Sequence, residues 1–402
     1  MIAITLLSVA SVLAPAQADI NKTIENALKF GQDGKYGQVK FNSRIRYENA
    51  NTSDTTNKTA EALTLRIRLG YLTPEFNDLQ AYAELEVNQD VGVNDYNSVR
   101  NGKTQYDVIA DPQEKELNRF WISYKGIPDT LLKVGRQRIQ LDNQRFIGNV
   151  PWRQLEQTFD AGTITNASLP NTTFKAGYII NSRDIVAREN DMDTGFANLA
   201  YTIKDIGKLT AYSYLIDFNE SKAQNTNSNQ TYGGRFDGDF QLNDDFKALY
   251  TAEYAWQKDH GDNPIDYQVS YYNFIVGLSA FGITFKGGIE QLDGQNGKGF
   301  STPLATNHAF QGWADLFLAT PKDGIRDLYG LVSTKFMGVK LLAVYHDFDD
   351  DTGNIDYGSE WDFLITKKFG KHYSLLAKYA YYNADAFKTD TQKIWVQAGI
   401  SF

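Results

Sequence analysis

Apolar and polar residues alternate with a period of two along almost the entire chain. Between residues 63 and 71, every odd position holds Leu, Ile or Tyr, whereas the even positions hold Thr, Arg, Arg and Gly. The alternation recurs at residues 39–47, at residues 79–88 and through the rest of the sequence. Successive side chains of a β-strand point to opposite faces, so this pattern predicts strands with one apolar and one polar face. We count about eighteen such segments, and no helical rhythm of 3.6 residues competes with them.

The connections between these segments alternate between short and long. Bacterial outer-membrane barrels have an even number of antiparallel strands, short periplasmic turns and long outer loops. A soluble β-sandwich has no reason to alternate loop lengths along its whole chain. The sequence therefore predicts an all-β fold, a transmembrane antiparallel up-and-down β-barrel of about eighteen strands. The short connections contain Thr73-Pro74, Gly126-Ile127-Pro128, Leu169-Pro170-Asn171, Asp205-Ile206-Gly207, Asn243-Asp244-Asp245, Phe281-Gly282, Met337-Gly338 and Phe369-Gly370.

The final strand fits a closed barrel as well. Residues 393–402 alternate up to the terminal Phe402, which resembles the signal that the outer-membrane assembly machinery reads. With both chain termini in the periplasm, an even strand count agrees with a closed barrel, which leaves no sheet edge exposed to lipid.

The chain divides into three segments. Residues 1–18 are expected to be a signal peptide, because the apolar run Ile2–Ala14 precedes a small-x-small site at residues 16–18. This run is too short to span a bilayer, although no Lys or Arg precedes it. Residues 19–36 are expected to form a short periplasmic segment, whose residues 21–29 form a helix that either plugs the lumen or frays. Residues 37–402 form the barrel.

Composition agrees with a barrel in the outer membrane of a Gram-negative bacterium. The mean hydropathy is −0.44, yet the chain carries 24 Tyr and 24 Phe. A membrane barrel reconciles these values, because only alternate residues face lipid. The absence of Cys suits an exported protein without disulfides. A net charge of −9 argues against a nucleic-acid partner, and we expect outer-membrane lipid and lipopolysaccharide as partners.

The sequence gives no indication of catalysis or of a cofactor. Its four histidines, His260, His308, His346 and His372, are scattered, and neither a Gly-x-Ser-x-Gly elbow nor a His-x-x-x-His pair is present. An outer-membrane hydrolase would need a His within hydrogen-bonding reach of a Ser. We therefore expect no enzyme.

An acidic stretch surrounds Gly353. Its composition is similar to that of a calcium loop, but the Gly comes one position late and no suitably spaced Glu follows. A solvated outer loop that bridges to lipopolysaccharide through divalent ions is the other interpretation, and we predict no metal site. The acidic residues are Asp347, Asp349, Asp350, Asp351 and Asp356.

Several arginines fall on the polar, lumen-facing side of the first four predicted strands. Arginines on a barrel wall can focus a positive potential in the lumen and select anions. Glu84 and Glu86 on the third strand could instead pair with them and form a neutral ladder that stiffens the wall. Both interpretations remain open here. The wall arginines are Arg44, Arg46, Arg66, Arg68 and Arg119.

Two long connections are rich in aromatic residues. Residues 141–156 include Arg145, Trp152 and Arg153, and residues 294–323 include His308, Phe310, Trp313, Asp315 and Phe317. Exposed Trp and Phe side chains are unfavourable, so we expect both loops to pack inward.

The same two loops carry a family resemblance. Gly135-Arg136-Gln137, Leu141-Asp142, Arg145, Gly148, Trp152-Arg153-Gln154 and Thr158-Phe159-Asp160 resemble a signature of the alginate-export family of outer-membrane proteins, and residues 308–315 with Thr320-Pro321 and Asp323-Gly324 look like its second hallmark. The resemblance implies an eighteen-stranded barrel with an Arg-lined, electropositive lumen. It adds Arg145 and Arg153 to the wall arginines as contacts for an anionic solute. Arg136 is in phase with the lipid-facing Leu132 and Val134.

The sequence thus favours a passive outer-membrane channel for small anionic solutes or acidic saccharides. Export of an acidic polysaccharide such as alginate, with periplasmic export components as partners, is the alternative within transport. A closed structural or adhesive barrel is the alternative outside it.

Overall fold

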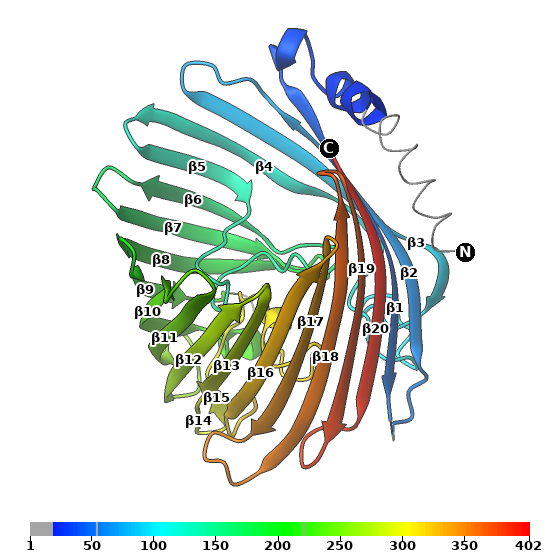
Figure 1. Cartoon of the computed structure of the whole chain (residues 1–402), viewed down its shortest axis with the longest axis vertical. Coiled ribbons are helices and arrows are strands. Elements are labelled where there is room, and N and C mark those ends of the chain that lie inside the picture. The colour runs from blue at the N-terminus through cyan, green and yellow to red at the C-terminus, as the bar shows by residue number, and fades with distance from the viewer. Residues whose placement is uncertain (1–18, 54, 220–221) are drawn as a thin grey trace.

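The fold is an antiparallel sheet of eighteen strands that closes on itself (Figure 1). This computed structural model describes residues 19–402 apart from residues 54, 220 and 221. The long strands pair in chain order, and β20 closes the barrel against β1, with Gln397 opposite Arg46. The predicted barrel and its strand count are confirmed. The expected signal peptide, residues 1–18, lies outside the described residues.

The first half of the barrel comprises β1 (Gln38–Thr52), β2 (Ala60–Leu72), β3 (Leu79–Asp95), β4 (Glu114–Ile127), β5 (Thr130–Gln137), β6 (Thr158–Asn166), β7 (Thr172–Arg183), β8 (Glu189–Ile203) and β9 (Gly207–Ile216). The second half comprises β10 (Asn229–Gln241), β11 (Phe246–Asp259), β12 (Gln268–Ala280), β13 (Ile283–Leu292), β16 (Ile325–Phe336), β17 (Val339–Asp349), β18 (Asp356–Phe369), β19 (Tyr373–Ala384) and β20 (Thr391–Ser401). The connections contain η1 (Gln32–Gly34), α2 (Lys222–Asn225), η2 (Asn307–Ala309) and the short hairpin β14 (Gly294–Gln295) and β15 (Lys298–Gly299).

The two ends of the barrel differ in their connections. Eight short turns, such as residues 281–282 between β12 and β13, lie at one end, which we call the turn end. The opposite loop end carries the longer connections, including residues 96–113, 138–157 and 293–324. Short turns of outer-membrane barrels are periplasmic, so the turn end is the periplasmic end.

Side chains alternate between the lipid face and the lumen, as the sequence pattern predicts. On β2, Leu69 and Tyr71 are exposed on the outside, whereas Arg66 and Arg68 are buried inside the barrel. The described residues contain no helix that is both long enough and apolar enough to cross a bilayer.

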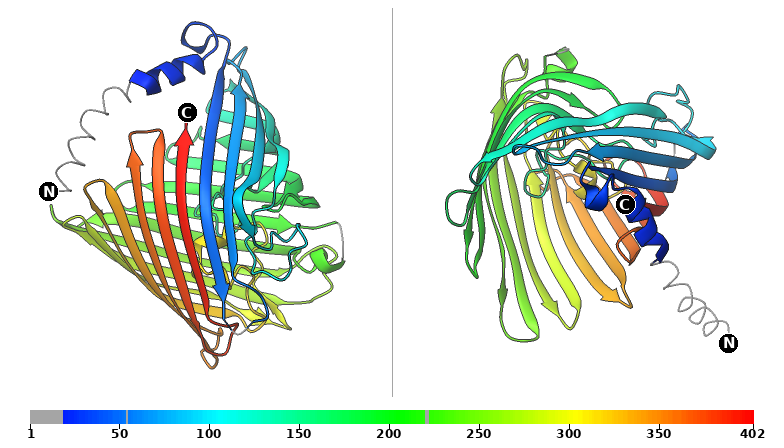
Figure 2. Two further views of the ribbon diagram at one scale, coloured as in Figure 1. Left: turned by 90° about the vertical axis from the view of Figure 1, so that its right-hand side faces the viewer. Right: turned by 90° about the horizontal axis from the view of Figure 1, so that it is seen from above.

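The lumen is filled at the loop end by the two aromatic-rich loops, which fold inward as expected (Figures 1 and 2). Phe146 of the first loop packs against Tyr271 of β12 and Phe300 of the second loop, with ring centroids 5.4 and 5.9 Å away. An apolar core therefore lies inside the barrel, between the loops and the wall.

Residues 19–27 form a helix beside the turn end (Figure 2). Glu25 bridges to Lys371 Nζ at 2.6 Å and to His372 Nε2 at 2.7 Å, next to the turn between β18 and β19. The helix therefore docks at the rim and does not plug the lumen.

Candidate functional site

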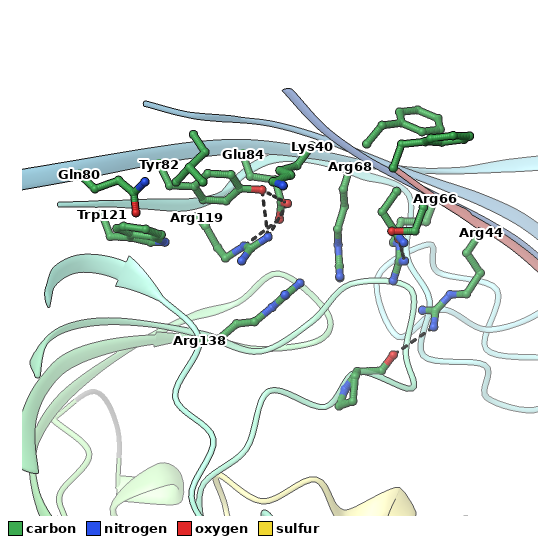
Figure 3. A pocket seen from close by; sticks show the side chains of 16 residues that line it. Lys40, Arg44, Arg66, Arg68, Gln80, Tyr82, Glu84, Arg119, Trp121 and Arg138 are labelled. Carbon is green, nitrogen blue, oxygen red and sulfur yellow. Dashed lines mark hydrogen bonds and ion pairs between the residues drawn. The ribbon is translucent and has the colours of Figure 1, made fainter. Parts of the chain in front are cut away.

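A cavity of about 540 Å³ opens in the lumen beneath the inward-folded loop 138–157 (Figure 3). We call it the basic vestibule. Its wall is built from the turn-end halves of β1 to β4, and Pro151 of the loop contributes to its roof. Six cationic side chains but only one acidic side chain, Glu84, line it. The cations are Lys40, Arg44, Arg66, Arg68, Arg119 and Arg138.

Arg44 and Arg66 stand directly opposite each other on β1 and β2. Like charges in such cross-strand pairs repel each other. The loop relieves this repulsion in part, because Arg44 donates to Gln154 Oε1 at 2.8 Å and to the Pro151 carbonyl at 3.0 Å. Arg44 also donates to the Arg153 carbonyl. Neutral acceptors hold this guanidinium in place without cancelling its charge.

Three of the cationic side chains in the vestibule have no close carboxylate partner in the part of the chain that the structure describes. Within the described residues, Arg44 and Lys40 form no ion pair, and the nearest carboxylate contact of Arg66 is to Glu86 at 3.8 Å. Glu86 is engaged more closely by Arg68, at 2.5 Å. These three cations are therefore the side chains best able to attract an anion.

The remaining cations of the vestibule are paired with carboxylates. Arg119 lies 2.5 Å from Glu84, and Arg138 lies 2.6 Å from Glu156. Burial raises the pKa of the Glu156 carboxyl, but the charges of Arg68 and Arg138 outweigh burial and lower that pKa below its usual value. Pairing of wall arginines with Glu84 and Glu86, one of the two interpretations of the sequence, is thus present for Arg119 and Arg68. It does not extend to Arg44 of β1, which forms no ion pair within the described residues.

A second cavity of about 370 Å³ continues from the vestibule toward the turn end. The two cavities share Arg44 and Arg66. Lys368 and Lys371 line the second cavity near the periplasmic rim, so a basic path leads from that rim to the arginine pair.

Arg46, Arg145 and Arg153 do not line the vestibule; they attach the loops to the wall. Arg145 lies 2.9 Å from Glu290 of β13, and Arg153 lies 3.2 Å from Glu48 of β1. Arg46 donates to the Trp152 carbonyl at 2.5 Å and stacks over the Trp152 ring at 4.1 Å. All three guanidinium groups are almost completely buried.

An aromatic clamp joins both loops to β19 and β20. It consists of Lys378 on β19, Trp395 on β20, Trp152 of the first loop, and His308 and Trp313 of the second. The Lys378 ammonium lies 3.5 Å from the Trp313 ring centroid and 4.3 Å from that of Trp152, and it donates to His308 Nε2 at 2.7 Å. Burial lowers the pKa of His308 to about 3, so the imidazole is neutral and able to accept this hydrogen bond.

The structure also places Arg136 and the acidic loop around Gly353. Arg136 lies on the outer face, as its phase predicts, 2.7 Å from Asp160 and 3.2 Å from Glu189. In the acidic outer loop, Asp350 accepts backbone hydrogen bonds from Asn354 and Ile355. Within the described part of the chain, no group of three or more His, Asp or Glu side chains is placed to hold a metal ion.

Several residues that line the vestibule were not among the site residues predicted from the sequence. Lys40 follows from the alternation of β1, because it shares a face with Arg44. Tyr82 and Trp121 also lie on predicted polar faces, but their ring packing at 5.6 Å comes from the pairing of β3 and β4. Arg138 follows the end of β5, and no local pattern indicates that it turns into the lumen.

Comparisons with known proteins agree with this architecture. The model of the family described as alginate export matches residues 35–287. Among solved structures, OccAB4 of Acinetobacter baumannii is similar with a TM-score of 0.72 and 14% identity, over 90% of this chain and 97% of that chain. OpdQ of Pseudomonas aeruginosa gives 0.71 and 15%, over 92% and 99%. OpdK of Pseudomonas aeruginosa, in a structure with vanillate, gives 0.71 and 13%, over 90% and 98%. The curated proteins include no match.

Proposed function

This chain belongs to the alginate export family, and we propose that it is a passive channel for small anionic solutes or acidic saccharides in the outer membrane of a Gram-negative bacterium. The family and the outer-membrane barrels that it resembles point to a channel rather than an enzyme. The observation that carries the proposal is the pair Arg44 and Arg66, both of which line the cavity. Arg44 is held there by Gln154 and the Pro151 carbonyl of the loop. Arg66 donates to Asn42 Oδ1 of the wall.

The mechanism requires no covalent step. An anion that enters from the periplasmic rim meets Lys368 and then the arginine pair. Lys371, at the same rim, is already bridged to Glu25. Each guanidinium can form two hydrogen bonds to a carboxylate, which makes Arg suited to recognise it. Because Arg68 and Arg119 are already paired with glutamates, the attraction stays moderate, and a solute can also leave.

The role of the loops follows from their contacts. Arg145 and Arg153 are engaged by Glu290 and Glu48, so we assign them to holding the constriction. The contacts of His308 argue against the alternative that this barrel is a hydrolase. Its Nδ1 contacts Asp315 and its Nε2 contacts Lys378, so both ring nitrogens are occupied and neither is free to activate a Ser.

Single-channel recording in planar bilayers tests the proposal. Reversal potentials under a KCl gradient should indicate anion preference, and Arg44→Ala and Arg66→Ala should each reduce it. Arg136→Ala is the matched control, because it removes the same charge from the outer face and should leave selectivity unchanged. A cation-selective channel, or an equal effect of Arg136→Ala, would contradict the proposal.

Export of an acidic polysaccharide is the second candidate, and the family description favours it. The clamp and the apolar core oppose it, because both loops would have to leave the lumen before a polymer could pass. Alginate oligomers added on the periplasmic side distinguish the candidates. Blocking events that shorten at higher voltage indicate that the polymer passes through, whereas blocking that persists at higher voltage supports the small-solute channel. A barrel that conducts no ions at all would instead be structural or adhesive.

A further inference from the structure

Each of the eight short connections at the turn end carries, or is directly preceded by, a large apolar side chain that is exposed. Ile127 and Phe369 are the last residues of β4 and β18, and the other six lie within the connections. Met337, Phe281 and Phe76 are 79, 76 and 73% exposed, the three highest values among the large apolar side chains of the described residues. We call the full set the apolar turn ring. Its members are Phe76, Ile127, Leu169, Ile206, Leu242, Phe281, Met337 and Phe369.

The loop end shows the opposite tendency. Its connections are much longer, yet their described residues include only four large apolar side chains that are exposed: Val99, Val108, Leu318 and Ile355. The longer connections offer more positions for apolar residues, yet fewer of their apolar side chains are exposed. Connection length therefore does not explain why exposed apolar side chains gather at the turn end.

Turn geometry does not account for the ring either. Phe281 and Met337 occupy the first central position of two-residue hairpin turns with φ of 52° and 49°, followed by Gly282 and Gly338. Asn, Asp or Gly is the preferred residue there, because a left-handed conformation is sterically unfavourable for other side chains. In three other turns the left-handed positions are taken by Asp129, Asn171 and Asp205. Each of them has a member of the ring one or two residues away in the sequence, namely Ile127, Leu169 and Ile206. An apolar residue is thus present even where the turn disfavours it.

The ring continues the lipid-facing surface of the wall. The Phe281 ring packs edge-on against Phe246 at 5.4 Å, and Phe246 shares the outer face of β11 with the exposed Tyr254. On β18, Phe369 follows Phe363 and Ile365 at period two along the same outer face. At these two turns the exposed apolar side chains therefore continue the membrane-facing band of the wall, with Lys367 between Ile365 and Phe369 on β18.

We propose that the apolar turn ring is embedded in the periplasmic leaflet of the outer membrane. Its occupant is the phospholipid of that leaflet, because the ring continues the lipid-facing wall at the turns of Phe281 and Phe369. Burial of these side chains in lipid offsets both their exposure and the unfavourable turn positions. The periplasmic mouth of the channel then lies level with the membrane surface, and residues 19–37 are the part that a periplasmic partner can reach.

Spin labelling tests this proposal on the folded, full-length barrel, which contains no native Cys. Met337→Cys and Leu169→Cys would each carry a nitroxide, in protein refolded into phosphatidylcholine vesicles. Leu169 is not at a left-handed position, so its variant is free of any turn defect at Met337. Val276→Cys, exposed on the outer wall, is the lipid reference, and Lys35→Cys in the N-terminal segment is the water reference.

Accessibility to oxygen and to a water-soluble nickel complex is then compared. We expect nickel accessibility at both turn positions to be at least several-fold lower than at Lys35, with oxygen accessibility closer to that at Val276. Nickel accessibility equal to that at Lys35 would overturn the proposal, because the ring would then lie in water and be free for a protein partner.

Discussion

Lys378 places its ammonium nitrogen 3.5 Å from the centroid of the Trp313 ring, inside the barrel, and forms no ion pair itself within the described residues. A buried ammonium is costly unless other groups replace its hydration. Here the rings of Trp152 and Trp313 and the His308 imidazole replace it. Because these groups come from both inward loops, one wall lysine contacts both loops of the constriction at once.

Removal of this ammonium should loosen the loops. Lys378→Ala deletes the cation–π contacts and leaves a cavity, so we expect a loss of about 2 kcal/mol or more in unfolding free energy and a larger, noisier conductance. Urea unfolding and single-channel recording measure the two effects. Lys378→Met fills the cavity without the charge and should recover part of the stability. Lys204→Ala, an exposed lysine in the turn between β8 and β9, should change neither stability nor conductance. Unchanged conductance in Lys378→Ala would mean that the clamp does not hold the loops.

The arginine pair of the vestibule predicts a conflict between stability and function. Arg66→Gln removes the like charge opposite Arg44, so we expect the unfolding free energy to rise by about 0.5 kcal/mol. Anion preference should fall at the same time, because one of the three cations without a close carboxylate partner among the described residues is lost. Urea unfolding should show a higher unfolding free energy for Arg66→Gln, and reversal potentials should show a lower anion preference. A variant that loses both stability and selectivity would show that Arg66 has a structural role.

The Arg145–Glu290 pair offers a test of loop attachment. Both side chains are buried and lie 2.9 Å apart. Arg145→Met leaves a buried carboxylate without its partner, which typically costs about 3–5 kcal/mol. The double variant Arg145→Met/Glu290→Met should recover most of that loss, since it removes the unpaired charge as well. If the double variant is no more stable than Arg145→Met, the ion pair is not the source of the loss.

The pKa of His308 predicts how acid affects the clamp. Asp315, Arg153 and Lys378 surround this imidazole, and burial lowers its pKa to about 3. An unfolded chain takes up this proton near pH 6.5, whereas the folded barrel does not. Stability should therefore fall as the pH decreases from 6.5 toward 3, by at most about 1.4 kcal/mol per pH unit from this group.

His308→Gln is the matching control for that pH dependence. Its amide can still accept a hydrogen bond from Lys378 and donate one to Asp315, but it does not titrate. The difference between the urea midpoints of the two proteins should shrink or change sign as the pH is lowered from 7 to 4. A constant difference would contradict the low pKa of His308.

Local sequence determined the barrel wall. Alternation fixed the direction of Arg44, Arg66 and the outward-facing Leu69, because a strand has only two faces and one of them meets lipid. The same rule placed Arg136 outside the lumen. The turn and loop lengths set the order and number of the strands, since each short connection allows only an antiparallel neighbour.

Only the tertiary structure decided which wall arginines have a close carboxylate partner. Arg44 and Arg68 are equivalent in sequence pattern, but Arg68 meets Glu86 across the β2–β3 pair, whereas Arg44 meets loop carbonyl groups more than one hundred residues away. Loop paths depend on long-range packing and not on period-two alternation. The sequence could therefore predict an arginine-lined wall, whereas strand pairing and the inward fold of residues 138–157 decided which of these cations line the vestibule without a close carboxylate.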